Sequence, residues 1–494
     1  MSNNIANLFV RLKLKQIMII LIACTITINL ILQSLHLYSI FTMPAITTFF
    51  RGSKYRNVGF IRGLKIPKNI ICSKGKYNWS GTFLRFFSPH VTARHIFKVK
   101  DFINYVKQRQ HNLNKRVLSL QIPIVIQDGE IYLLHANHAL SAKSGKETKR
   151  DKAYIHKWLM TMIDTLHSVS LATRLPNAYF ILDASDYPMG VLRTTIPNIL
   201  RFSASGDIKQ WNIPVPSGQF NRNYQKFFET WSRHNVYKNM YHFQQPIIPF
   251  EKRKTRGVWR GSYACHDSQD CSSCSRVAAV RASLNNPTIL SARFIDHFTN
   301  LETSQDRCRK QHFKDYKINL MNNSGPMNAL TMDQFSTYKF VVALKGTSYN
   351  HICKYLYLLN SIVLKEHNHR YHEYFDSSTQ DWVHHIPFHC HEFDQCDLIK
   401  LIRSAQQAEK NKTFPITWHS VANEGFKWAR IHLHPIGHAC YWYSLLLRTQ
   451  ALLTNDGFNE TIEKRTFSTT FLKINGIKVI NFETLLEYFE PINL

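Results

Sequence analysis

Apolar and polar positions alternate in blocks along the middle of the chain and predict both strands and helices. An apolar run over Val117–Leu134 is interrupted by Asp128-Gly129, a dipeptide that favours a tight turn, so the run predicts a β-hairpin. Ala153–Leu171 carries apolar residues at the spacing of an amphipathic helix, and Ala178–Leu182 is a short apolar strand pattern followed by acidic residues. This order is typical of an open α/β sheet, whose ligands bind at the carboxyl ends of the strands.

The second half of the chain repeats this order. Strand patterns lie at Phe340–Leu344, Ser361–Leu364 and Trp382–Phe388, and Ile352–Leu359 predicts a helix between the first two. The segments from Asp397 onward and over Thr417–Leu453 read as mostly helical. We therefore predict an α/β fold of two α/β units with a helical C-terminal part, divided near Glu251–Arg256, where the composition changes.

A continuous apolar segment near the start of the chain predicts a membrane anchor. Ile17–Leu35 contains no charged side chain, and at about 1.5 Å per residue it just crosses a hydrocarbon core of about 30 Å. Arg11, Lys13 and Lys15 precede it, so the positive-inside rule predicts a cytoplasmic N-terminus and a translocated remainder. We expect a single-pass type II signal anchor in the endoplasmic reticulum or Golgi membrane, with a cleaved signal peptide as the alternative.

Composition excludes some classes of protein. With 494 residues, of which 44% are hydrophobic, the chain is neither disordered nor of low complexity. The formal net charge of +29 raises the possibility of a nucleic-acid partner. Because the basic residues are spread along the chain without a repeated basic-aromatic module, we favour a solvated basic surface or an anionic substrate instead.

The cysteines and glycosylation motifs agree with an oxidising lumen. Cys24 lies in the apolar segment, and the nine later cysteines could form up to four disulfides and leave one free thiol. Glycans could be attached at four N-x-Ser/Thr sites: Asn78, Asn322, Asn411 and Asn459. A zinc site is the alternative for a group of cysteines and histidines that contains one C-x-x-C: Cys265, Cys271, Cys274, His384, His385, His389, Cys390, His391 and Cys396.

Three loops carry residues suited to moving a proton or holding an anionic group. Asp186 follows a strand pattern, and a carboxylate there is either a general base or a cap of the next turn. Trp259–Ser262, with Arg276 further on, offers close backbone approach, a hydroxyl and positive charge. Gly346–Asn350 leads from a strand into a helix and suits a diphosphate, whereas Asn350 in place of a second glycine disfavours a hydrolase nucleophile elbow.

Eight motifs occur in order within residues 115–455. They are D-Y-P (Asp186–Pro188), W-R-G-S (Trp259–Ser262), N-P-T-I-L-S-A (Asn286–Ala292), Y-K-F-V-V-A-L-K-G (Tyr338–Gly346), C-K-Y-L (Cys353–Leu356), S-I-V-L-K (Ser361–Lys365), W-V-H-H-I-P (Trp382–Pro387) and C-Y-W (Cys440–Trp442). Together they resemble glycosyltransferase family 90, which includes protein O-glucosyltransferases and fungal capsule xylosyltransferases. The resemblance implies a GT-B fold of two Rossmann-like domains facing a cleft, and inverting transfer from a UDP-sugar with no catalytic metal or other cofactor.

The resemblance also implies roles for particular residues. Asp186 matches the catalytic base, Ser262 and Arg276 match donor-binding positions, and the loop 347–352 matches the donor-phosphate loop. Many relatives carry arginine where this chain has Ile352, so Lys354 or Arg260 would have to supply that charge. The expected donor-binding residues are Arg260, Gly261, Ser262, Arg276, Thr347, Ser348, Tyr349, Asn350 and Lys354.

From this resemblance we expect a sugar, glucose or xylose, to move from a UDP-sugar to a hydroxyl of a protein or glycan acceptor in the secretory lumen. A catalytically inactive, lectin-like protein of the same fold is the alternative. The expected segments are a cytoplasmic tail (1–16), a transmembrane anchor (17–38), a stem and lead-in segment (39–95), an acceptor-side Rossmann-like domain (96–250), a donor-binding Rossmann-like domain (251–425) and C-terminal helices with a tail (426–494).

Overall fold

The chain divides into two compact units, and all residues that the computed structural model describes lie in the second, Gly59–Ile492. They are residues 101–102, 104–107, 121–134, 162–163, 166–167, 169–170, 173–183, 199–207, 212–216, 248–263, 274–295, 325–346, 350, 352–367, 370–390, 396–411, 416–433, 435–454 and 479–481. None of the helices in these ranges is long and apolar enough to span a bilayer. The expected anchor, Ile17–Leu35, lies outside the described residues.

The described strands form a mixed sheet, a parallel sheet and a small two-stranded sheet. The mixed sheet has the order β13 (Val479–Asn481), β2 (Glu130–Leu134), β1 (Gln121–Gln127), β3 (Ala178–Asp183), β4 (Arg201–Ser203) and β6 (Asn212–Pro214). The parallel sheet has the order β12 (Ile386–Phe388), β10 (Ile362–Glu366), β9 (Tyr338–Ala343), β7 (Lys254–Gly261) and β8 (Leu290–Phe294). The third pairs β11 (Tyr371–His372) with β5 (Gly206–Asp207).

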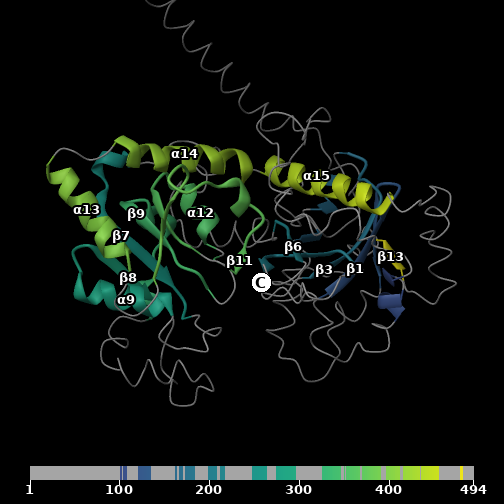
Figure 1. Ribbon diagram of the computed structural model, residues 1–494, viewed down its shortest axis with the longest axis horizontal. Coiled ribbons are helices and arrows are strands. Elements are labelled where there is room, and N and C mark those ends of the chain that lie inside the picture. Colours follow the sequence, from purple (N-terminus) through teal and green to yellow (C-terminus); the bar gives the residue numbers. More distant parts are fainter. Residues whose placement is uncertain are drawn as a thin grey trace, which may run out of the picture. The chain divides into compact units, whose positions relative to one another are not determined.

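Helices connect and cover these strands (Figure 1). The α-helices include α9 (Ser275–Asn285), α11 (Met332–Phe335), α12 (Cys353–Tyr357), α13 (Leu398–Lys410), α14 (Ile416–His432) and α15 (Pro435–Thr454). Residues 101–102, 104–107, 162–163, 166–167 and 169–170 are also helical. Three short 3-10 helices lie at Phe250–Lys252, Pro326–Asn328 and Asp376–Ser378. The expected helical C-terminal part is therefore confirmed. The helix expected over Ile352–Leu359 is also confirmed, over the shorter range of α12.

The predicted hairpin is present as β1 and β2. Asp128 and Gly129 both have positive φ, 57° and 92°, the conformation of a tight turn whose twist matches that of the strands. Pairing of Ile126 with Ile131 then sets the register of the two strands. The described residues within Ala153–Leu171 are helical, as predicted.

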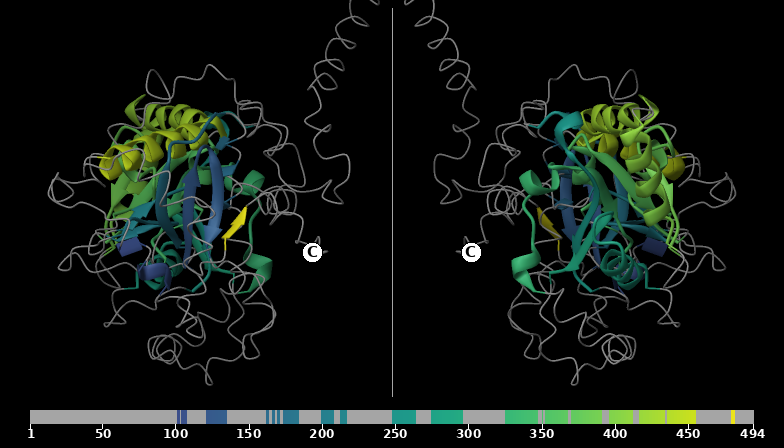
Figure 2. Two further views of the ribbon diagram at one scale, coloured as in Figure 1. Left: turned by 90° about the vertical axis from the view of Figure 1, so that its right-hand side faces the viewer. Right: turned by 90° about the vertical axis from the view of Figure 1, so that its left-hand side faces the viewer.

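The mixed sheet differs from the fully parallel sheet that a Rossmann-like domain would contain. β3, β4 and β6 run parallel, but β1 runs antiparallel to both β2 and β3. β13, which the sequence analysis left in a helical tail, pairs antiparallel with β2 (Figure 2). The chain's C-terminal part thus completes the sheet that its first described strands begin.

The parallel sheet is buried on both faces. All six residues of β9 are buried, which explains why its sequence is a continuous apolar run rather than an alternating one. Phe340 and Val342 belong to the core cluster that includes residues of α9 and α13, whereas Val341 and Ala343 belong to the cluster that includes residues of α12. The architecture is therefore α/β with helices on both faces of a parallel sheet, and in outline it matches the expectation.

The strand predicted over Trp382–Phe388 is shorter in the structure. Only Ile386–Phe388 forms the strand, because a turn that begins at Gln380 precedes it. In this turn the carbonyl oxygen of Gln380 accepts the backbone N–H of Val383 at 3.3 Å and that of His384 at 3.0 Å. Trp382, within this turn, has a φ of 62°, which cannot continue a strand.

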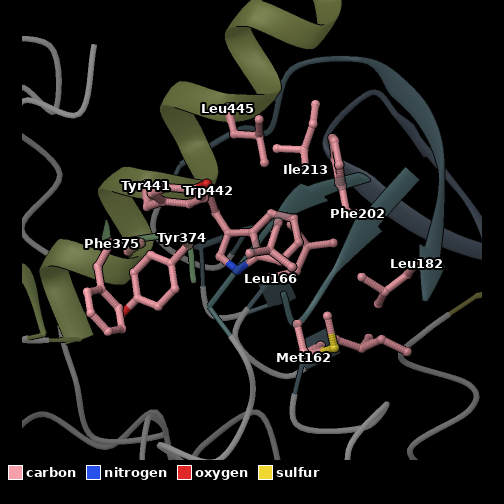
Figure 3. Close-up of a cluster of buried hydrophobic side chains, with 14 of the residues drawn as sticks. Met162, Leu166, Leu182, Phe202, Ile213, Tyr374, Phe375, Tyr441, Trp442 and Leu445 are labelled. Atoms are coloured by element: carbon pink, nitrogen blue, oxygen red, sulfur yellow. The ribbon is translucent and has the colours of Figure 1, made fainter. Parts of the chain in front are cut away.

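The C-Y-W motif lies on α15 and packs against the mixed sheet. Trp442 is fully buried, with ring centroids 6.0 Å from Phe202 and 6.5 Å from Phe180. Figure 3 shows Trp442 and Leu445 directed from α15 toward Phe202 and Ile213. The Tyr441 hydroxyl donates to the carbonyl oxygen of Pro214 at 2.5 Å. The motif is therefore a core contact that joins the C-terminal helices to the first sheet.

Gly425 in α14 lets the helix approach the turn before β12, and we expect Gly425→Ala to destabilise the protein. In an exposed helix this change would add roughly 1 kcal/mol of stability. Here the new Cβ would lie 2.5 Å from the His384 carbonyl oxygen, so backbone must move, at a cost of about 1–3 kcal/mol. Urea unfolding measures the difference. Asn423→Ala, in the same helix, is the control. A Gly425→Ala variant as stable as the wild type, or more stable, would contradict the prediction.

Candidate functional site

The strand order of the parallel sheet identifies one point at its carboxyl edge where a ligand is expected. β7 and β9 are neighbours, but the chain continues from β7 to β8 on one side and from β9 to β10 on the other. Connections that diverge in this way form a topological switch point, and open α/β sheets bind ligands beyond the carboxyl ends of the strands there.

Arg276 joins the two strand ends at this point. It is the second residue of α9, and its Nη1 donates to the carbonyl oxygen of Ser262 at 2.7 Å, just after β7. Its Nε donates to the carbonyl oxygen of Lys345 at 2.9 Å, just after β9. The guanidinium carbon lies 5.7 Å from the centroid of the Trp259 ring. A positive charge is thereby held beside the two loops that the sequence analysis assigned to the donor.

Gly261 and Ser262 complete the end of β7. A Cβ on Gly261 would lie 2.6 Å from the indole of Trp259, so any larger residue here would displace this ring. Ser262 is exposed, and its Oγ lies 3.4 Å from Nη1 of Arg276. The W-R-G-S motif therefore brings a hydroxyl and a guanidinium together at the carboxyl edge.

Arg260 is as buried as Arg276, but its hydrogen bonds join it to Asn328 and to Ser291 of β8. Its Nε donates to the carbonyl oxygen of Asn328 at 2.6 Å, and its Nη1 donates to the carbonyl oxygens of Trp259 and Ser291 at 2.7 and 2.6 Å. Its Nη2 donates to Oγ of Ser291 at 3.1 Å, and burial lowers the pKa of the guanidinium to about 10. All three nitrogens thus bind the protein, so the arrangement does not favour the predicted donor role of Arg260.

A buried carboxylate that the sequence analysis missed positions the start of the second loop. Oε2 of Glu366, at the end of β10, accepts the backbone N–H of Lys345 at 2.8 Å, and Oε1 lies 3.3 Å from Nζ of the same lysine. Glu366 is only 4% exposed. An acidic residue that ends an apolar strand pattern was the only sequence signal for this contact.

The loop itself is described at its ends only. Thr347, Ser348 and Tyr349 lie outside the described residues, so their predicted roles stay predictions. Oδ1 of Asn350 accepts the backbone N–H of Ile352 at 3.2 Å and the Asn350 carbonyl accepts that of Cys353 at 3.0 Å, which together start α12. The buried Nδ2 of Asn350 has no hydrogen-bond partner in the described part of the chain.

Lys354 is fully buried in α12. Its Nζ lies 3.2 Å from Oε1 of Glu373, which is itself 4% exposed. The backbone N–H of Glu373 donates to Asp376, and Asp376 pairs with Lys365 at 2.5 Å. The first ion pair is buried and the second is half-buried, and together they connect α12 and β10 to the segment 373–376. This arrangement favours a structural role for Lys354 over the expected contact with a diphosphate.

The proposed acceptor side contains Asp183, the last residue of β3. It is completely buried, and its Oδ2 accepts a hydrogen bond from Nε2 of Gln121 at 3.1 Å. Oε1 of Gln121 in turn accepts from the Tyr105 hydroxyl at 2.8 Å and from Nη1 of Arg201 at 3.0 Å. Asp183 therefore belongs to a buried polar network. Asp186, three residues later, lies outside the described residues, and its role as base stays a prediction.

The cysteines favour disulfides over zinc. Cys390 and Cys396 form a disulfide with each other. Cys274 and Cys440 each take part in a further disulfide, and Cys353 is a free, buried thiol. Among the described residues no group of three or more His, Cys, Asp or Glu side chains is arranged to hold a metal ion. Cys265, Cys271 and His391 lie outside them.

Glu373 generates a testable pH dependence of stability. Burial, followed by the charge of Asp376, raises its pKa to about 7, although Lys354 opposes the shift. A carboxyl whose pKa rises on folding binds more protons in the folded state between about pH 4.5 and 7, so its contribution falls as the pH rises through that range. We expect the stability of the wild type relative to Glu373→Gln to fall by about 1–3 kcal/mol from pH 5 to pH 8. Urea unfolding of both proteins measures this, and a difference that is constant or rises with pH would refute it.

Comparison with known proteins places these features in a family. Residues 146–466 match the model for Glycosyl transferase family 90. The chain is 26% identical over 282 residues to Protein O-glucosyltransferase 2 of Danio rerio, covering 57% of this chain and 48% of the relative. It is 23% identical over 318 residues to Protein O-glucosyltransferase 3 of Homo sapiens, covering 64% and 53%.

A third relative has a similar degree of identity. Protein O-glucosyltransferase 1 of Homo sapiens is 21% identical over 303 residues, which cover 59% of this chain and 68% of the relative. The chain spans about half the length of the first two relatives. The family match extends from β3 to β12, so it includes the parallel sheet, the strands β3, β4 and β6 of the mixed sheet, and the carboxyl edge where Arg276 lies. This chain therefore belongs to glycosyl transferase family 90.

Proposed function

We propose that the protein transfers a sugar, with inversion, from a UDP-sugar to a hydroxyl group of a protein or glycan acceptor. The observation that carries the proposal is Arg276, whose guanidinium bridges the loops after β7 and β9 at the switch point of the parallel sheet. Its charge would stabilise the diphosphate, with Gly261, Ser262 and the 347–350 loop as neighbours. The parallel sheet would then form the donor half of a GT-B fold, and the mixed sheet the acceptor half.

Inversion requires a single displacement at the anomeric carbon. The bond from this carbon to the acceptor oxygen forms as its bond to the UDP phosphate oxygen breaks, and a base takes the hydroxyl proton. We assign the base to Asp186, because Asp183 is buried in its network with Gln121. Glucose is the first donor sugar to test, since the relatives are named as O-glucosyltransferases, and xylose is the second.

We further propose a lumenal catalytic part held by the Ile17–Leu35 anchor, in the endoplasmic reticulum or the Golgi. The disulfide of Cys390 with Cys396 and the bonded states of Cys274 and Cys440 support an oxidising compartment. Asn411, in one of the four glycosylation motifs, is exposed at the C-terminal end of α13, where a glycan can be attached without displacing a core side chain.

Purified protein incubated with UDP-glucose, UDP-xylose or UDP-galactose tests the function. Release of UDP that depends on an added protein or glycan acceptor, together with transfer of the sugar to it, is the expected result. Binding of UDP without release from any of the three donors would support the inactive, lectin-like alternative instead.

We expect Arg276→Ala to raise the Michaelis constant for the UDP-sugar by about 10- to 100-fold. A guanidinium at a diphosphate contributes charge-assisted hydrogen bonds of about 1.5–3 kcal/mol, and its loss also frees the loops at Ser262 and Lys345. Initial rates at varied donor concentration measure the effect. Arg281→Ala, in the same helix, is the control. A larger effect of Arg281→Ala would show that the donor charge is assigned to the wrong residue.

For Asp186→Asn we expect transfer to fall by about 10²- to 10⁴-fold, with UDP affinity and thermal stability nearly unchanged. The amide keeps the size of the carboxylate but cannot accept the acceptor's proton. Asp183→Asn is the comparison, and it should lower thermal stability more than turnover because Asp183 is buried and bonded to Gln121. Full turnover in Asp186→Asn, alongside a folded but inactive Asp183→Asn, would reverse the assignment.

A further inference from the structure

Two adjacent apolar side chains are exposed on the turn that precedes β12. Trp382 is 55% exposed and Val383 is 40% exposed. Elsewhere in the described ranges, Met327 and Leu447 are the large hydrophobic residues with comparable exposure, and neither has such a neighbour. A tryptophan contributes a large apolar surface, and leaving it in water is unfavourable. This pair therefore requires an explanation that core packing does not supply.

Trp382 also adopts a backbone conformation that bulky residues rarely accept. Its φ is 62°, in the left-handed region. The turn holds this conformation because the backbone N–H of Trp382 donates to the carbonyl oxygen of His385 at 2.7 Å and that of His384 donates to Gln380 at 3.0 Å. Nδ1 of His384 also accepts the backbone N–H of Gln380 at 2.9 Å. A strained backbone conformation persists only where the surrounding structure holds it in place, and such residues cluster at ligand sites.

Buried groups beneath the turn keep it rigid. Nε2 of His385 lies 2.9 Å from Oδ1 of Asp381, and its Nδ1 lies 3.0 Å from the Tyr357 hydroxyl. Burial lowers the pKa of His385 to about 4, so the neutral ring donates to Asp381 through Nε2 and accepts from Tyr357 through Nδ1. Gly425 of α14 allows the backbone of His384 to pack directly on that helix. The indole is therefore presented on a fixed frame.

Two polar residues precede Trp382 in the chain. Asp381 is 56% exposed, and its Oδ1 is the atom that lies 2.9 Å from Nε2 of His385. Gln380, on the other side of Asp381, is also exposed. An exposed indole that follows a carboxylate and an amide in the chain offers the groups that bind a pyranose, which has one face of C–H groups and an edge of hydroxyls. One tryptophan and one valine make too small a patch for a stable protein interface of about 1,600 Å².

We propose that the Trp382 turn is a carbohydrate-binding site in which a pyranose ring of a neutral glycan stacks on the indole and hydrogen-bonds to Asp381 and Gln380. The turn enters β12 at the amino end of that strand, whereas Arg276 and Ser262 lie beyond the carboxyl ends of the parallel strands. The site is therefore separate from the proposed donor site. It would hold a glycan-bearing substrate through a second contact and so raise its effective concentration at the enzyme.

Electrophoresis of the full-length protein in native gels that contain soluble arabinoxylan, mannan or β-glucan tests the proposal. These polysaccharides are neutral, so the protein's net charge of +29 does not itself cause retention. We expect at least one of them to slow the wild type, and Trp382→Gly to weaken that apparent affinity at least tenfold. Glycine adopts positive φ freely, so this variant should have an unchanged or higher thermal midpoint.

Two further variants make the test specific. Gln380→Ala should weaken retention severalfold, and Leu447→Ala, which removes an exposed apolar side chain of α15, should leave it unchanged. A wild type that migrates as in plain gel with all three polysaccharides would overturn the proposal, as would equal retention of Trp382→Gly. No sugar nucleotide is present, so the result is independent of the transferase activity proposed above.

Discussion

Burial of the parallel sheet on both faces is the constraint on which the rest of the described structure depends. Because the strands are covered on each side, charged side chains lie chiefly where strands end. There they form hydrogen bonds with backbone groups that would otherwise be unpaired. Arg253, before β7, donates to the carbonyl oxygens of Leu359 and Asn360 at the amino edge. Arg276 does the same for Ser262 and Lys345 at the carboxyl edge. Arginines thus connect the ends of different strands at both edges of the sheet.

This use of arginine and lysine changes the interpretation of the basic composition. Much of the net charge of +29 was expected on a solvated surface, but several cations are internal. Lys354 pairs with Glu373, Lys339 with Glu409, and Arg260 with backbone carbonyl groups. Arg276 is the member of the predicted donor set whose charge remains at the carboxyl edge, which is why the proposed chemistry depends on it.

The two ends of the parallel sheet offer different chemistry. At the carboxyl edge, Arg276, Ser262 and the loop after Lys345 suit an anionic diphosphate. At the amino end of β12, the turn carries the exposed indole of Trp382 and, on the preceding residue, the partly exposed carboxylate of Asp381. In both places hydrogen bonds beneath the surface, from Glu366 in one case and His385 in the other, fix the groups before any ligand arrives. Such preorganisation reduces the entropy lost on binding.

The sequence by itself determined the features that depend on neighbouring residues. Asp128-Gly129 specified the hairpin, the apolar run over Phe340–Leu344 specified a buried strand, and the ordered motifs identified the family. Short-range conformational preference suffices for the hairpin, an unbroken apolar run for the buried strand, and the order of the motifs for the family.

Tertiary structure alone decided the remainder, because the deciding partners lie far apart in the chain. β13 joins β2 across more than three hundred residues of sequence, Lys354 is neutralised by Glu373, and the turn at Trp382 depends on Tyr357 and on Gly425 of another helix. No local pattern around Lys354 distinguishes a lysine that binds a phosphate from one that is buried in an ion pair. That distinction is set by which carboxylate the fold brings within 3.2 Å of its Nζ.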